Sequence, residues 1–132
     1  KINDLDDGLK KVDILSLSVP LTEKTHNMIN LEKIKMMKKG AIIINTSRGS
    51  VVNEKDINEA VNKGIIYGAG LDVFEKEPPD NDNPILKNNK IVLSPHAATF
   101  TNECRSKMSV ETVQNIIDFF ENKLHKTKIV KL

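Results

Sequence analysis

The stretch AIIINTSRGSVVN, residues 41–53, joins an apolar run to a sharply polar turn. Its first part, residues 41–45, is short, rich in isoleucine and too apolar to be half exposed, which predicts a buried strand of a parallel sheet. Thr46, Ser47 and Arg48 follow at once. Packing alone seldom places an arginine directly after a buried strand. The stretch therefore predicts a strand and raises the question of what Arg48 binds.

Three other apolar runs have the same character, at residues 13–19, 65–74 and 90–96. Segments typical of helices lie between the runs or before them, at residues 5–12, 31–39 and 53–64. The last of these has Asn53 as N-cap, acidic residues in its first turn and Gly64 as its stop. The alternation is the βαβ pattern, so we expect an α/β fold with a parallel sheet covered on both faces.

The remainder of the chain departs from this alternation. Residues 74–89 contain three prolines and several Asn and Asp residues, which predicts a long loop that is either functional or disordered. An amphipathic helix is expected from Thr101 to about Asn122. Its apolar stripe consists of Cys104, Met108, Val113, Ile116, Ile117 and Phe120. We expect Cys104 to lie in the core.

Composition excludes several classes of protein. The 132 residues are 39% hydrophobic and 29% charged, which is typical of a globular domain. The net charge of +2 with interspersed signs argues against nucleic-acid binding. No apolar run approaches a membrane span, and no His, Cys or carboxylate spacing matches a metal site. The single cysteine fits a reducing compartment, so we expect a cytoplasmic protein. The N-terminus lacks the apolar core of a signal peptide. Because it also lacks a starting Met, we expect a partial chain.

Ligands of parallel sheets bind beyond the carboxyl ends of the strands, so the polar residues that follow the runs are candidates. These are Thr46, Ser47, Arg48, Asp72, Glu75, Glu77, Ser94 and His96. An arginine, a histidine and carboxylates can bind and polarise a carbonyl compound that carries a carboxylate. Gly49 directly after Arg48 indicates an unusual turn. The residues alone also allow a surface Arg48, a buried and satisfied His96, and a solvated Glu77.

Two blocks of sequence together point to a known family. The block INTSRGSVVNEKDINEAVNKGIIYGAGLDVFEKEP, followed by IVLSPHAA, resembles the D-isomer-specific 2-hydroxyacid dehydrogenases, and DILSLSVPLTEKTHNMIN is similar to the family's preceding strand and loop. The family includes D-3-phosphoglycerate dehydrogenases, glyoxylate and hydroxypyruvate reductases, and D-lactate dehydrogenases. The resemblance implies that residues 1–97 are the second half of a Rossmann-type, doubly wound NAD(P)-binding domain. Residues 98–132 would return to the substrate domain through a C-terminal helix. The G-x-G-x-x-G turn is absent and is expected upstream.

The resemblance also assigns roles to particular residues. It implies that Arg48 holds the substrate's carboxylate and carbonyl, that His96 is the acid/base, and that Glu77 pairs with it, while Glu75 is a bystander. The expected cofactor is NAD, with NADP possible, and Asp72 would contact the nicotinamide carboxamide. Other residues expected at the cofactor are Val19, Pro20, Thr25, Thr46, Ser47 and Ala98.

The implied activity is reduction of a small 2-keto acid by hydride transfer, with no metal, nucleic-acid or membrane partner. The full-length protein is expected to be a homodimer, and this chain alone is expected to be inactive. Two alternatives remain open at this point. One is a dehydrogenase-like, NAD-responsive binding module of the corepressor type. The other is a half-domain that serves as a stable interaction piece.

Overall fold

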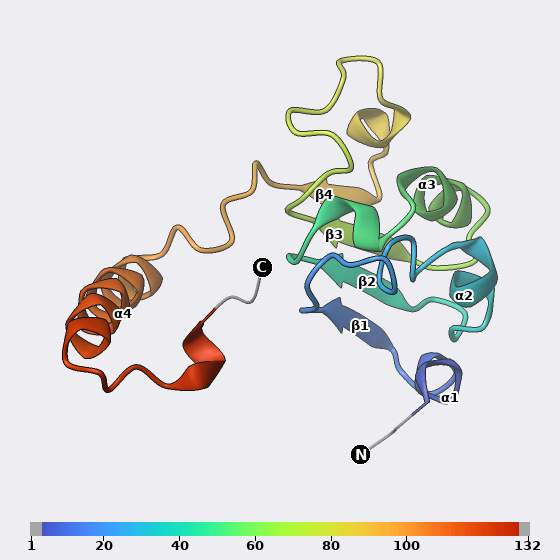
Figure 1. Cartoon of the computed structure of the whole chain (residues 1–132). Coiled ribbons are helices and arrows are strands. Elements are labelled where there is room, and N and C mark those ends of the chain that lie inside the picture. Colours follow the sequence, from blue (N-terminus) through green and yellow to red (C-terminus); the bar gives the residue numbers. More distant parts are fainter. Residues whose placement is uncertain (1–3, 130–132) are drawn as a thin grey trace. The chain divides into compact units, whose positions relative to one another are not determined.

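A computed structural model describes residues 4–129, which divide into two compact units on either side of the Ala97–Ala98 junction (Figure 1). The first unit contains strands β1 (Ile14–Leu17), β2 (Ile42–Asn45), β3 (Gly68–Leu71) and β4 (Ile91–Leu93) and helices α1 (Leu5–Leu9), α2 (Leu31–Lys35) and α3 (Glu54–Asn62). It also contains the short 3-10 helices η1 (Gly49–Val51) and η2 (Pro84–Lys87). The second unit contains α4 (Asn102–Phe120) and the 3-10 helix η3 (Lys126–Lys128).

The four strands form one sheet in the order β1-β2-β3-β4, and each neighbouring pair is parallel. In the register, Ile43 of β2 lies between Leu15 of β1 and Ala69 of β3. The predicted α/β fold is confirmed. Because all the strands run the same way, their carboxyl ends share one edge, where ligands of such sheets bind.

The core of the first unit forms where the helices meet the sheet, and α1, α2 and α3 lie together on one side of the strands (Figure 1). Leu9 of α1, Ile34 of α2 and Ile57 of α3 are each at most 1% exposed and belong to one cluster with the central strands. Burial of each such side chain contributes about 1.5–3 kcal/mol relative to exposure. The apolar stripes of three short helices thus cover one face of the sheet.

The other face of the sheet was predicted to be covered as well, and this is wrong for the described residues. Ile14 of β1 is 61% exposed and Val92 of β4 is 74% exposed, whereas their neighbours Leu15 and Ile91 point inward. Successive side chains of a strand point to opposite faces. Covering both faces requires two sets of helices, and the three helices packed on this sheet supply one set.

Local signals set several element ends. Asn53 caps α3 by accepting a hydrogen bond from Asp56 N at 3.0 Å, as predicted, and Gly64 beyond its end has a φ of +67°. β3 is shorter than the predicted run 65–74, because residues 65–67 and 72–74 lie outside the ladder. α2 ends at Lys35, earlier than the prediction of residue 39. The predicted loop contains one turn of 3-10 helix, η2.

In the second unit, α4 begins after Thr101, whose Oγ1 accepts a hydrogen bond from Cys104 N at 3.1 Å. None of the residues of α4 is buried. Cys104 is half-buried, so its predicted place in the core is wrong for the described residues. In the part of the chain that the structure describes, every helix is too short or too polar to cross a bilayer.

Candidate active site

The turn after β2 presents Arg48, and the side chain of Asn45 organises its backbone. Asn45 is 1% exposed. Its Oδ1 accepts hydrogen bonds from Ser47 N at 3.0 Å and from Ser47 Oγ at 2.7 Å. Its Nδ2 donates to the Arg48 carbonyl at 3.0 Å. Asn45 was not among the predicted site residues; the signal that could have found it is a lone amide ending an apolar strand, where it needs local partners.

Gly49 brings this turn against the segment that follows β3. A Cβ placed on Gly49 would lie 1.9 Å from both the carbonyl carbon and the oxygen of Phe74. Only glycine permits this approach. The φ of Gly49 is not in the left-handed region, so the residue is required by close packing and not by the unusual turn that the sequence indicated.

The Arg48 guanidinium lies on the surface at the carboxyl ends of β1 and β2. Arg48 is exposed, and its Nη1 donates to the carbonyl of Ser47 at 2.7 Å. Beside it is an open hollow of about 500 Å³. The hollow is lined by Ser18, Val19, Pro20, Leu21, Thr46, Ser47 and Arg48. A cationic fork at the rim of such a hollow can bind a carboxylate with two parallel hydrogen bonds.

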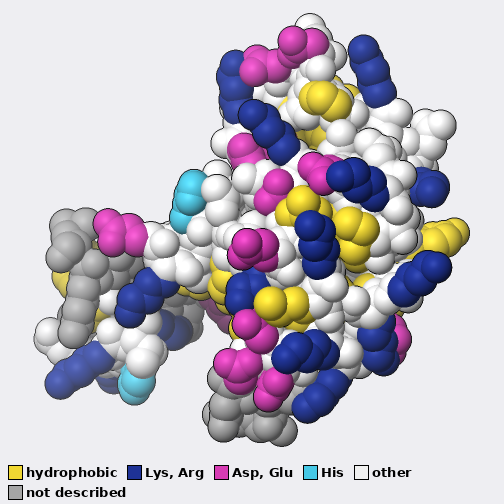
Figure 2. All heavy atoms as spheres, turned by 90° about the vertical axis from the view of Figure 1, so that its right-hand side faces the viewer, with side chains coloured by type: hydrophobic (Ala, Val, Ile, Leu, Met, Phe, Trp, Pro, Cys, Tyr) yellow, Lys and Arg dark blue, Asp and Glu magenta, His cyan; other side chains and the backbone are white. Residues whose placement is uncertain are grey.

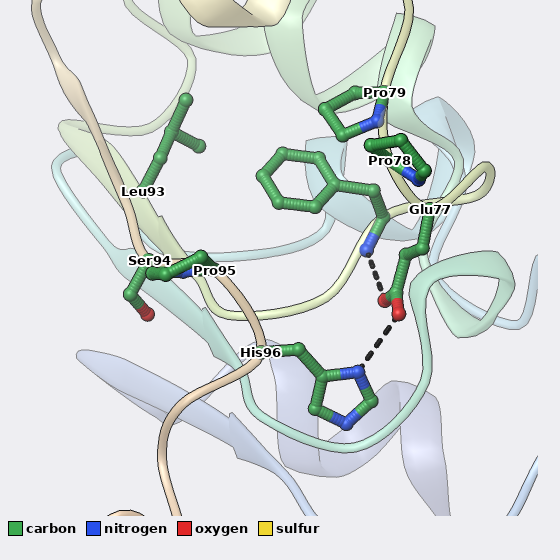
Figure 3. A pocket seen from close by; sticks show the side chains of 8 residues that line it. Glu77, Pro78, Pro79, Leu93, Ser94, Pro95 and His96 are labelled. Carbon is green, nitrogen blue, oxygen red and sulfur yellow. Dashed lines mark hydrogen bonds and ion pairs between the residues drawn. The ribbon is translucent and has the colours of Figure 1, made fainter.

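Glu77 and His96 meet directly at the same edge (Figure 3). Glu77 Oε2 lies 2.8 Å from His96 Nδ1, and Glu77 Oε1 accepts a hydrogen bond from Phe74 N at 3.0 Å. Hydrogen bonds from His96 and then from Phe74, with smaller contributions from the charges of His96 and Arg48, hold the pKa of Glu77 below its ordinary value of 4.5. Glu77 is therefore an anion that faces a donor on Nδ1. The second ring nitrogen, Nε2, points away from Glu77 (Figure 3).

The backbone of His96 is held in an uncommon conformation by Asp72. The φ of His96 is +53°, in the left-handed region, which costs a non-glycine residue about 1–2 kcal/mol. Asp72, 3% exposed, accepts His96 N through its carbonyl at 2.8 Å and Ala97 N through Oδ1 at 2.8 Å. Ser94 Oγ donates to the same Oδ1. Strain held by such a network is typical of a functional position.

A second cavity, of about 480 Å³, lies beside this pair and is mostly apolar. Its lining consists of Phe74, Glu77, Pro78, Pro79, Leu93, Ser94, Pro95 and His96. Leu93, Pro78 and Pro79 lie on one side of the Glu77–His96 contact, and Nε2 lies on the other (Figure 3). The pair thus separates an apolar pocket from the side on which a substrate could reach Nε2.

The structure brings most of the predicted site residues to one edge of the sheet. Arg48, Glu77 and His96 lie there, and of the predicted cofactor residues Val19, Pro20, Thr46 and Ser47 line the hollow. Thr25 borders it by donating its hydroxyl to the Pro20 carbonyl at 2.7 Å. Asp72 and Ala98 are not among the lining residues.

Glu75, predicted to be a bystander, has a partner in the structure. Its Oε1 accepts a hydrogen bond from Glu54 N at 2.8 Å, at the first residue of α3. Sequence reasoning also missed Glu54, which is 9% exposed and bonds the backbone of Glu75 in return. A glutamate at the first position of a helix is ordinarily explained by its favourable interaction with the helix dipole. The sequence around Glu54 therefore carries no signal for its contact with Glu75.

Other kinds of site receive no support from the described part of the chain. Residues 4–129 contain no group of three or more His, Cys, Asp or Glu side chains placed to hold a metal ion. Acidic and basic side chains are interspersed on the face shown in Figure 2, without a continuous basic stripe.

Comparison with known proteins points to one family. Residues 1–98 match the family described as D-isomer specific 2-hydroxyacid dehydrogenase, NAD binding domain. The chain is 49% identical over 115 residues to a glyoxylate reductase of Korarchaeum cryptofilum (strain OPF8), covering 87% of this chain and 35% of that protein. It is 42% identical over 123 residues to a glyoxylate/hydroxypyruvate reductase B of Enterobacter sp. (strain 638), covering 93% and 38%.

A solved structure agrees with these relatives. The D-lactate dehydrogenase from Aquifex aeolicus, complexed with NAD and lactic acid, superposes with a TM-score of 0.76 at 35% identity. The match covers 92% of this chain and 41% of that one. The matches thus span only 35% to 41% of the length of these relatives. It belongs to the D-isomer specific 2-hydroxyacid dehydrogenase family, of which residues 1–98 match the NAD binding domain.

Proposed function

We propose that the longer protein containing this chain is an NAD(P)-dependent oxidoreductase that reduces a small 2-keto acid to a D-2-hydroxyacid. The observation that carries the proposal is the contact of 2.8 Å between Glu77 and His96 Nδ1, which leaves Nε2 directed away from Glu77. Arg48 lies near enough for its charge to lower the pKa of Glu77. The names of the relatives, glyoxylate reductase and glyoxylate/hydroxypyruvate reductase, support the same chemistry.

The nicotinamide end of the cofactor would lie in the hollow beside Arg48. The hollow has a volume of about 500 Å³ and lies at the carboxyl ends of two adjacent parallel strands, the usual place for a dinucleotide. Val19, Pro20, Thr46 and Ser47 would line it, with Thr25 behind Pro20, and Asp72 and Ala98 would approach the carboxamide. When bound, NADH or NADPH supplies a hydride to the substrate's carbonyl carbon. The printed sequence has no G-x-G-x-x-G turn, so the pyrophosphate requires another part of the longer protein.

The chain's own residues provide binding and proton transfer. Arg48 binds the substrate carboxylate through its guanidinium fork and orients the adjacent carbonyl. Protonated His96 donates the Nε2 proton to the carbonyl oxygen as the carbon accepts the hydride. Glu77 accepts the Nδ1 hydrogen bond, which fixes the ring orientation and stabilises the charged imidazolium. The product is a neutral hydroxyl beside a carboxylate that Arg48 still holds.

The domain organisation follows from the same proposal. The first unit would be the second half of the cofactor-binding domain, residues 1–97. Residues 98–132 would return to the substrate domain, and the longer protein would be a cytoplasmic homodimer. The exposure of Ile14 and Val92 supports a larger sheet domain, since a complete doubly wound domain covers both faces.

The test is a turnover assay on the longer protein and on this chain alone. Each would be mixed with NADH or NADPH and with glyoxylate, hydroxypyruvate or pyruvate, and the loss of reduced cofactor followed by absorbance. We expect turnover by the longer protein and none by the isolated chain. Tight NADH binding by the longer protein without turnover of any 2-keto acid would contradict the proposal and favour an NAD-responsive binding module.

A further inference from the structure

The carboxylate of Glu54 joins the two ends of the loop that carries Glu77. Glu54 Oε1 accepts a hydrogen bond from the backbone N–H of Glu75 at 2.5 Å, and Oε2 accepts one from Asn83 Nδ2 at 2.9 Å. The residue is 9% exposed, so its charge is compensated by these donors rather than by bulk water. One buried side chain thus closes residues 75–83 into a loop with fixed ends.

Both partners of Glu54 are themselves held in place. Glu75 Oε1 accepts a hydrogen bond from Glu54 N at 2.8 Å, which satisfies one of the unpaired N–H groups at the start of α3. Asn83 Oδ1 accepts a hydrogen bond from Ile85 N at 3.1 Å at the start of η2. Each polar atom in these contacts thus acts either as a donor or as an acceptor, and exchanging an oxygen for an N–H group would break the pairing. We call Glu54, Glu75 and Asn83 the loop clasp.

Phe74 connects the loop clasp to the acid–base pair. Its N–H donates to Glu77 Oε1 at 3.0 Å, and the next N–H along the chain, that of Glu75, donates to Glu54. Its carbonyl packs against Gly49, where a Cβ would lie only 1.9 Å away. Phe74 is therefore fixed at both of its peptide groups, and Glu77 takes its orientation from the first of them.

We propose that Glu54 is a positioning residue: by closing the loop 75–83, it holds Glu77 in the orientation in which its carboxylate meets His96 Nδ1. The consequence for catalysis rests on the proposed function, whereas the positioning itself does not. Glu54 lies on α3, bonds Glu75 and Asn83, and acts on His96 only through the loop that carries Glu77.

The polarity of the loop clasp allows a reciprocal exchange. In Glu54→Gln, the amide oxygen can still accept from Glu75 N, but the amide nitrogen then faces Asn83 Nδ2, so two donors oppose each other. Adding Asn83→Asp restores an acceptor at that point, and the new carboxylate can still accept from Ile85 N. The matched control is Glu59→Gln, because Glu59 lies on the same helix and its carboxylate pairs with Lys63 at the surface.

The readout is an NMR titration of the Glu77 side-chain carboxyl in this chain. His96, Phe74 N and Arg48 are the groups that hold its pKa low. We expect Glu54→Gln to raise the pKa of Glu77 toward its ordinary value, Glu54→Gln/Asn83→Asp to restore it, and Glu59→Gln to leave it unchanged. A purely structural role would lower stability without moving this titration.

Two results would overturn the proposal: an unchanged Glu77 titration in a folded Glu54→Gln chain, or a double variant that folds without recovering it. If Glu54→Gln alone fails to fold, the double variant decides by the same readout.

In the longer protein, Glu54→Gln is expected to lower kcat about tenfold with little change in KM for the keto acid, because Glu77 and His96 lose their alignment. The double variant is expected to recover kcat. An inactive wild-type protein would refute the proposed function, whereas the Glu77 titration would still decide the positioning. A loss of kcat in Glu54→Gln without a change in that titration would overturn the positioning.

Discussion

Arg48 and the Glu77–His96 pair share one edge of the sheet, but their side chains are held in different ways. Asn45 and Gly49 fix the backbone around Arg48, while its exposed guanidinium bonds the carbonyl of its own neighbour, Ser47. Glu77 and His96 bond each other, and Phe74 N anchors the carboxylate. Under the proposed function, this chain preassembles the pair that would transfer protons and leaves the guanidinium that would bind the substrate carboxylate open to a ligand. The two should therefore respond differently to substitution.

The largest effect is expected at the preassembled pair. His96→Asn removes the proposed proton donor but keeps a small polar side chain, so we expect kcat in the longer protein to fall about 10³-fold with little change in KM. Steady-state kinetics with NADH and glyoxylate measures both quantities. A rise in KM with an unchanged kcat would mean that His96 binds the substrate. His96 and Arg48 would then have the same role, which would contradict the comparison.

Arg48→Lys should act mainly on binding. Lysine keeps the charge but loses the planar fork, and a charged hydrogen bond contributes about 1.5–3 kcal/mol, so KM for the keto acid should rise about tenfold to hundredfold. The fall in kcat should be smaller than in His96→Asn. NMR signals of Glu77 in this chain should stay in place as the control. A kcat loss equal to that of His96→Asn at unchanged KM would contradict the comparison.

Glu77→Gln should have a smaller effect than either, because the amide oxygen can still accept the Nδ1 hydrogen bond. The variant removes the anion that faces His96 Nδ1, so kcat should fall about tenfold with little change in KM. Steady-state kinetics of both proteins measures the loss. A loss of kcat as large as that of His96→Asn would contradict this order of effects.

The smallest effect concerns stability. The pKa of Glu77 is lowered in the folded chain, chiefly by the His96 hydrogen bond, so ionised Glu77 stabilises the fold above its ordinary pKa of 4.5. This contribution is lost as the pH falls through the lowered value. Wild type should therefore exceed Glu77→Gln in stability at neutral pH by a small amount, and the difference should vanish in acid. Urea unfolding of both proteins from neutral pH to acid measures the difference in the free energy of unfolding. A difference that grows as the pH falls would contradict this prediction.

Sequence patterns predicted the helices and strands better than they predicted the surfaces against which these elements pack. The apolar faces of α3 and α4 were both readable, yet α3 buries Ile57, Ala60 and Val61, whereas α4 buries none of its residues. An amphipathic period predicts that a helix forms and which of its faces is apolar. The surface that covers this face belongs to another part of the chain or to another chain, and the period says nothing about it. The same limit explains the exposed outer face of the sheet.

The candidate site likewise contains residues that the sequence predicts and residues that it does not. Arg48, Glu77 and His96 could be selected because polar side chains at the ends of buried strands are conspicuous, and the family resemblance assigned them roles. Asn45 carried a usable signal, because it is a lone amide at the end of an apolar strand. Glu54 could not be selected, since its partners Glu75 and Asn83 lie far from it in sequence. Tertiary contacts of this kind leave no periodic signal.

The most direct test of the account is a crystal structure of the longer protein with NADH and oxamate, an unreactive amide analogue of a 2-keto acid. The account predicts the oxamate carboxylate on the Arg48 guanidinium and its carbonyl oxygen within hydrogen-bond distance of His96 Nε2, with Glu77 still on Nδ1. Oxamate bound away from Arg48, or a His96 ring turned so that Nε2 faces Glu77, would contradict it.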